Sequence, residues 1–328
     1  MGTFETVALS PLLGTPLWFW VVFFAVIASL MALDLGVLNR KDHVIGARES
    51  LLLSAFYLSV GLCFAVFIWQ MEGATKAIEF TTGLLIEKSL SLDNIFVISL
   101  IFGVLGIPAL YQHRVLVWGI IGVIILRGIL IGVGTALVTE FHWVLWLFGA
   151  FLIFTAIRMF FSGEMASDPA DSRLLCFFKR HLRVSEKLDG HHFVTRERDA
   201  SGRLRRVATP LLLALLMVET ADLIFAVDSV PAIFAITTDP FIVFTSNIFA
   251  VLGLRALYFA LAAVIRRFAY LKTALAIVLV FIGGKIFWND IFGKVDPLLS
   301  LGITVAVLAG GVLYSLWRSR NEGQRHEC

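Results

Sequence analysis

The residues of this sequence that could do chemistry occur in two segments with the same spacing. Each segment has two acids separated by five residues and followed at once by a small amide or hydroxyl side chain: Glu87, Asp93 and Asn94 in the first, and Asp222, Asp228 and Ser229 in the second. Carboxylate, amide and hydroxyl oxygens suit a hard divalent cation such as Mg²⁺, Ca²⁺ or Mn²⁺. The duplicated pattern therefore predicts a site that handles a divalent cation.

Further polar residues lie in the same apolar surroundings and are expected to pair charges or couple protons: Lys88, Arg127, Glu219, Arg255 and Asn247. A charge at the centre of a membrane costs roughly 2.5–3.5 kcal/mol on insertion scales, so each needs a partner or a polar cavity. Arg127 and Arg255 are expected to hold some of the acids in place. Asn247 could supply an oxygen ligand or an interhelical hydrogen bond. The charges could also neutralise one another as purely structural contacts between helices.

The spacing within each segment restricts how its acids can act. Six residues on an ideal helix correspond to about 600°, so Glu87 and Asp93 point about 120° apart. Either the helix breaks locally, as transporter helices do at their binding sites, or the two acids have different roles. Glu219 and Asp222 are three residues apart and are expected to share a helix face.

The elements that must hold these residues are predicted to be membrane-spanning helices. Hydrophobic residues make up 59% of the 328 residues and charged residues 16%, against about 45–50% and about 25% in soluble proteins. A span needs about 20 mostly apolar residues. Nine segments are candidates: 17–38, 51–71, 80–105, 115–138, 143–161, 209–236, 241–264, 273–288 and 298–317. We therefore expect an all-α, polytopic membrane protein with about nine transmembrane helices.

The third to fifth spans and the sixth to eighth spans are predicted to be two copies of one three-helix unit. Besides the acidic segments, Leu126-Arg127 in the fourth span matches Leu254-Arg255 in the seventh. Because three is an odd number, the second copy must enter the membrane from the opposite side. Inverted repeats of this kind are the architecture of secondary transporters. The expected divisions are 1–79, a first repeat at 80–161, a cytoplasmic loop at 162–208, a second repeat at 209–288, and 289–328.

Basic residues in the loops predict the orientation of the chain. Of its 27 Lys and Arg residues, 20 lie in one set of alternate loops and two in the other set. Since basic loops stay in the cytoplasm, the N-terminus is expected outside and the C-terminus inside the cell. The loop 162–208 is then cytoplasmic, with a short helix at 174–182 and a small β-hairpin formed by 192–198 and 203–207. This basic loop could also dock a partner protein.

Several function classes find no support in the sequence. Three widely separated cysteines form no pair, and a net charge of +3 is too small to indicate nucleic-acid binding. The nucleotide-binding pattern GxxxxGK[ST] is also absent from the sequence. We therefore expect no enzyme and no permanently bound cofactor, with the lipid bilayer and a divalent cation as the molecules that the protein contacts.

The two acidic segments resemble the signatures of a known family. Glu87-Lys-Ser-Leu-Ser-Leu-Asp-Asn-Ile-Phe96 is similar to the first signature of the TerC family, and the stretch from Glu219 to Arg255 to the second. The resemblance implies an exporter built from two three-helix repeats, manganese efflux in the Alx-like branch, and an older link to tellurium resistance. Carried over position by position, it implies that metal is handled by these residues: Glu87, Asp93, Asn94, Asp222, Asp228 and Ser229.

The leading hypothesis is a secondary-active exporter of Mn²⁺ in the cell inner membrane, driven by a proton gradient. Asp93 and Asp228 are expected to be paired ligands, while Glu87 and Asp222 complete the site or carry protons. One alternative is a non-transporting membrane factor that aids metal loading, protein insertion or tellurite resistance. A membrane redox modulator is the other alternative.

Overall fold

The computed structural model describes residues 11–33, 46–141, 143–161, 173–185, 188–198, 204–261, 269–293 and 295–325. Within these ranges, nine helices overlap the nine predicted spans. They are α2 (Leu17–Leu33), α3 (Ala47–Glu72), α4 (Ala74–Val104), α5 (Ala109–Glu140), α6 (Trp143–Phe161), α8 (Pro210–Phe234), α9 (Pro240–Leu261), α10 (Ala269–Ile291) and α11 (Pro297–Arg325). The expected all-α architecture is confirmed.

Among the described residues, six helices are long and apolar enough to cross a membrane: α3, α5, α6, α8, α10 and α11. The apolar parts of α2 and α9 are shorter. Helix α4 has 31 residues, which at 1.5 Å per residue exceeds a hydrocarbon core of about 30 Å. It carries the charged residues Glu87, Lys88 and Asp93 within that length. The number of spans therefore stays a prediction.

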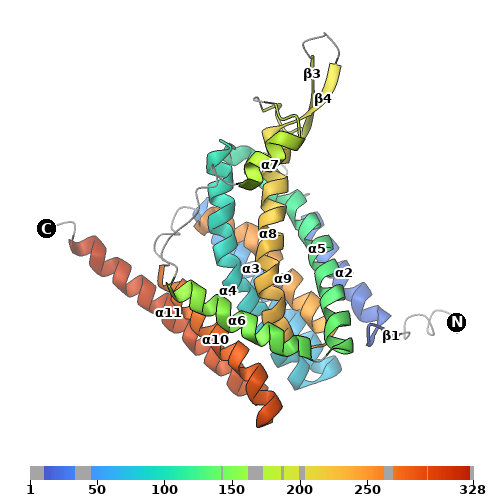
Figure 1. Ribbon diagram of the computed structural model, residues 1–328, viewed down its shortest axis with the longest axis vertical. Coiled ribbons are helices and arrows are strands. Elements are labelled where there is room, and N and C mark those ends of the chain that lie inside the picture. Colours follow the sequence, from blue (N-terminus) through green and yellow to red (C-terminus); the bar gives the residue numbers. More distant parts are fainter. Residues whose placement is uncertain are drawn as a thin grey trace.

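Four of these helices, α4, α5, α8 and α9, surround the middle of the molecule (Figure 1). Helix α4 packs against α8 and α9, and α5 also packs against both. Helices α6, α10 and α11 lie together beside this group, with α6 against α10 and α10 against α11. One large apolar core combines aromatic residues of α2, α3 and α9, such as Phe23, Phe64 and Phe249.

Helices α4 and α8 run in opposite directions. The start of α4, at Thr75 and Glu79, lines the same cavity as the end of α8, at Phe234. In the predicted repeat, α4 corresponds to α8, and α5 corresponds to α9. The contact between α4 and α9 therefore has an equivalent in the contact between α8 and α5, and both pairs of helices pack together. This arrangement is what an inverted repeat requires, and the repeat itself stays a prediction.

The predicted polar segment between α6 and α8 contains a short helix and a β-hairpin at one end of the molecule (Figure 1). Helix α7 (Arg173–His181) precedes strands β3 (Val194–Arg198) and β4 (Leu204–Ala208), which pair antiparallel with Val194 opposite Ala208. The expected helix and hairpin are therefore confirmed. We call this end of the helices the hairpin end and the opposite end the far end. A second, short pair of strands, β1 (Pro11–Leu12) and β2 (Thr15–Pro16), precedes α2.

Candidate ion-binding site

Arg127, near the middle of α5, is the centre of a buried polar cluster. Its side chain is 1% exposed. The guanidinium contacts Asp222 of α8 at two points, because Nε donates to Oδ2 at 3.2 Å and Nη2 donates to Oδ1 at 3.1 Å. Its Nη1 also donates to Oε1 of Glu87 on α4 and, at 2.7 Å, to Oδ1 of Asn247 on α9. Ser229 Oγ lies 3.5 Å from the same nitrogen. Residues from three helices thus surround the cation that the fourth, α5, contributes.

The sequence explains why the cluster forms in the middle of the bundle. Each contributing residue lies several turns inside an apolar helix, so a solitary charge there would be without water. The pair Arg127–Glu87 and the pair Arg127–Asp222 are both buried. Removing one partner of a buried ion pair leaves an uncompensated charge, at a cost of about 3–5 kcal/mol. The arginine therefore fixes the four helices relative to one another as well as balancing charge.

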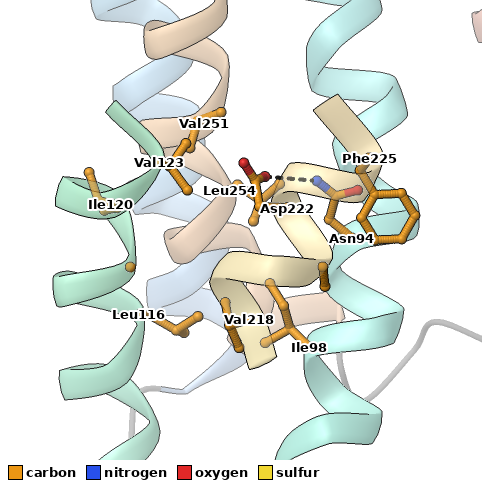
Figure 2. Close-up of a pocket in the computed structure, with 12 residues that line it drawn as sticks. Asn94, Ile98, Leu116, Ile120, Val123, Val218, Asp222, Phe225, Val251 and Leu254 are labelled. Atoms are coloured by element: carbon orange, nitrogen blue, oxygen red, sulfur yellow. Dashed lines mark hydrogen bonds between the residues drawn. The ribbon is translucent and has the colours of Figure 1, made fainter. Parts of the chain in front are cut away.

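Asn94 extends the cluster toward the hairpin end. Its Nδ2 donates to Oδ1 of Asp222 at 3.4 Å, and both residues line a small pocket of about 40 Å³. Figure 2 shows the carboxylate and the amide facing each other across this pocket, with apolar side chains such as Leu116 and Val218 around it. The volume exceeds the roughly 10–15 Å³ that one ordered water needs. The pocket therefore has room for one or a few water molecules against Asp222.

Glu219 lies near this cluster, with its carboxylate packed against α5. Both carboxylate oxygens are buried and neither has a partner among the described residues. The carboxylate packs against α5 at Gly119 and Gly122, and a Cβ atom added to Gly122 would overlap it. Glycine at position 122 is therefore what gives the carboxylate room. The sequence contained this signal as Gly119-Ile-Ile-Gly122, but its significance depends on which helix faces it.

Lys88 points to a different neighbour from Glu87. Its Nζ donates to the carbonyl oxygen of Ala250 on α9 at 3.4 Å. A Cβ atom at Gly253 would overlap the ammonium, so this glycine gives room to the lysine as Gly122 does to Glu219. Consecutive residues on a helix are about 100° apart, which is why Glu87 reaches Arg127 while Lys88 contacts α9.

Three predicted residues, Asp93, Asp228 and Arg255, lie within the bounds of α4, α8 and α9, and their side chains lie outside the part of the structure that is described. In the described part, no three His, Cys, Asp or Glu side chains are close enough to hold a metal ion. Both α4 and α8 continue as helices through their acidic segments, and α8 continues past Pro231. The structure thus gives no local break at the site, which favours different roles for the two acids of each segment.

A larger, polar cavity of about 1330 Å³ opens at the far end of the bundle. Its lining includes charged residues of α4, α10 and the start of α11: Glu79, Lys285, Asp290 and Asp296. Lys285 is 9% exposed and its Nζ donates to Oγ of Ser300 at 3.2 Å. A small, mostly apolar pocket with Asn94 and Asp222 on its wall therefore lies toward the hairpin end, and a large polar cavity lies at the far end.

Comparison with known proteins relates the chain to one family. Residues 72–323 match the family described as "Integral membrane protein TerC family". A relative from Myxococcus xanthus, named "Uncharacterized membrane protein STKORF319", is 47% identical over 95% of each chain. A relative from Escherichia coli K12, named "Putative membrane-bound redox modulator Alx", is 44% identical over 95% of this chain and 98% of its own. No solved structure shows a significant match.

Proposed function

The chain belongs to the TerC family of integral membrane proteins, and on this premise we propose that it is a secondary-active exporter of divalent cations, with Mn²⁺ as the main substrate. The observation that carries the proposal is the cluster around Arg127. Oxygen atoms of Glu87, Asp222 and Asn247 converge on one positive charge in the middle of four apolar helices. A set of oxygens that binds an organic cation there is also chemically suited to a hard metal ion.

The position of the cluster supports transport rather than a structural role alone. Substrate sites of secondary transporters lie near the bilayer midplane, between the two repeats. Here Glu87 and Arg127 come from the first predicted unit, and Asp222 and Asn247 from the second. The small pocket beside Asp222 lies toward the hairpin end, and the polar cavity lies at the far end. We propose that these spaces belong to the entry and exit routes of the ion.

We also propose which membrane holds the protein, how it is oriented there, and what drives transport. The basic residues of the loops support an inner-membrane protein with its N-terminus outside and the hairpin in the cytoplasm. Export then runs from the hairpin end to the far end. We propose that a proton gradient drives it and that the protein carries out transport without catalysing a covalent reaction.

The test is Mn²⁺ movement in proteoliposomes that contain the purified full-length protein and a trapped fluorophore quenched by Mn²⁺. The proposal predicts faster quenching than in protein-free liposomes, and a further increase when an imposed pH gradient favours proton exchange. An absence of flux with folded protein, with and without the gradient, would contradict it. That result would favour a membrane factor that acts through partners, with the basic hairpin as the docking surface.

The name of the Escherichia coli relative suggests a second candidate, a redox modulator. In the described part of this chain, the free cysteine Cys63 is exposed on α3 and is not among the residues that contact Arg127. A Cys63→Ser variant that transports Mn²⁺ like the unchanged protein is the result expected from the transport proposal.

A further inference from the structure

We infer that the guanidinium of Arg127 is a built-in substitute for the transported cation, and that it moves to the carboxylate of Glu219 when the ion occupies the cluster. This inference rests on the proposed function and adds an exchange step to it. In the structure the arginine occupies the oxygen cage formed by Glu87, Asp222 and Asn247.

The guanidinium of Arg127 and a metal ion at this site need the same oxygen atoms. Arg127 contacts both carboxylate oxygens of Asp222 and one oxygen of Glu87. It also contacts the amide oxygen of Asn247 at 2.7 Å. A divalent cation coordinated by these atoms would lie within a few ångströms of the guanidinium carbon. Two positive charges this close repel each other much more strongly in the protein interior than in water. Simultaneous occupation is therefore unfavourable.

When an ion occupies the cluster, the Arg127 side chain must move, because it cannot become neutral. The guanidinium group keeps its proton at all physiological pH values, whereas a lysine at this place could lose its charge. Its side chain is fully buried, so it cannot turn outward to water without separating the packed helices. A displaced Arg127 therefore needs another buried anion nearby.

Among the described residues, Glu219 is a buried acid that can supply this negative charge when the guanidinium reaches it. Its two oxygens are buried and have no hydrogen-bond partner in the part of the chain that the structure describes, which is costly for a carboxylate. It lies three residues before Asp222 on α8, a rise of about 4.5 Å along the helix axis. The Cα–Cβ bond of a helical residue tilts toward the helix N-terminus. For Arg127 this direction is the one in which Gly122, and the Glu219 carboxylate packed on it, lie along α5.

The exchange also explains how the cluster remains stable when the ion leaves. Without Arg127, release of the ion would leave the carboxylates of Glu87 and Asp222 buried without a counter-charge, although both are nearly inaccessible to water. The returning guanidinium restores neutrality. In the ion-bound state, Glu219 provides the negative charge that neutralises the arginine.

The experiment is a double-mutant cycle on Mn²⁺ binding by the full chain in detergent, measured from the loss of the electron paramagnetic resonance signal of free Mn²⁺. Glu219→Gln removes the second partner of the arginine and is expected to weaken binding about tenfold. Arg127→Gln removes the competitor and is expected to strengthen binding about tenfold. In the Arg127→Gln background, Glu219→Gln is expected to change binding less than twofold, because no guanidinium remains to be accommodated.

An equal loss on Glu219→Gln in both backgrounds would overturn the inference, because Glu219 would then act on the ion directly. Arg127→Lys, which keeps the buried charge, is the second variant if Arg127→Gln does not fold. Its shorter side chain cannot make the same contacts, so tighter binding than in the unchanged protein is expected, and unchanged or weaker binding would contradict the exchange. If the unchanged protein neither binds nor transports Mn²⁺, the proposed function itself fails.

Discussion

Arg127 and Asp222 meet at two points, with Nε 3.2 Å from Oδ2 and Nη2 3.1 Å from Oδ1. The two residues come from different predicted repeats, and the planar fork of the guanidinium matches the carboxylate in this geometry. A contact of this kind fixes α5 against α8 in distance and in rotation. Since Asp222 also accepts a hydrogen bond from Asn94 of α4, the same carboxylate connects three helices.

Replacing Arg127 is expected to destabilise the protein strongly. Arg127→Ala leaves Glu87 and Asp222 buried without a counter-charge, and the expected loss is about 3–5 kcal/mol of unfolding free energy. Arg158→Ala is the matched control, because Arg158 is exposed on α6. Thermal unfolding in detergent measures both variants. Equal melting temperatures for the two would show that the buried ion pairs do not support the fold.

Gly122→Ala is expected to disturb the site through Glu219 alone. The added Cβ atom would overlap the Glu219 carboxylate, and overpacking of this kind costs about 1–3 kcal/mol. Gly132→Ala on the same helix is the control, because nothing in the described structure lies within 4 Å of the added Cβ atom there. The double variant Gly122→Ala with Glu219→Ala should recover most of the lost stability. A double variant as unstable as Gly122→Ala alone would mean that another contact is responsible.

The sequence predicted the helices better than it predicted the contacts between them. Apolar length located the nine helices, and the Gly-bearing turn between two polar strand segments located the hairpin. Their positions in the middle of predicted spans marked Arg127 and Asn247 as unusual. The sequence did not decide whether Asn247 is an ion ligand or forms a hydrogen bond between helices. The structure places its Oδ1 on Arg127. Which side chain faces which depends on helix rotation and packing, and neither is encoded in spacing along one helix.

Glu219 illustrates the same limit. Its three-residue separation from Asp222 predicted a shared face, and from that one would expect both acids to contact the same cation. In the structure Asp222 contacts Arg127, whereas Glu219 packs on the glycines of α5. The difference arises because two glycines, Gly119 and Gly122, allow the longer side chain to lie against the helix backbone.

Asp239, at the start of α9 and at the far end, is expected to stabilise the protein as a helix cap and as a partner of Lys76. Its Oδ1 accepts a hydrogen bond from the amide of Phe241 at 3.0 Å, and its Oδ2 lies 2.8 Å from Nζ of Lys76. Asp239→Ala removes the helix cap and the ion pair, and should cost about 1 kcal/mol or slightly more. Asp239→Asn retains a capping oxygen and should cost less, since exposed ion pairs contribute about 0–1 kcal/mol. Thermal unfolding ranks the variants, and an Asn variant as unstable as the Ala variant would contradict the capping role.

The ion pair between Lys76 and Asp239 is expected to depend on pH. Burial lowers the pKa of Lys76, but hydrogen bonds with Asp239 and Glu72 and their charges outweigh burial and raise the pKa above its ordinary value of 10.5. Its contribution to stability is therefore complete below pH about 10 and is lost as the pH rises through the raised pKa. The melting-temperature difference between the unchanged protein and Lys76→Met should shrink between pH 8 and pH 11.5. A difference that stays constant over this range would rule out the ion pair as its cause.

The role of Asp222 in transport is measured as pH-gradient-driven Mn²⁺ flux in proteoliposomes containing Asp222→Asn. Asn keeps the size of the side chain and removes the charge that Arg127 contacts at two points. Glu140→Gln, which neutralises an exposed acid at the end of α5, is the matched control. With equal amounts of folded protein inserted, we expect at least a tenfold loss of flux for Asp222→Asn and no loss for Glu140→Gln. Equal flux in all three proteins would contradict this expectation.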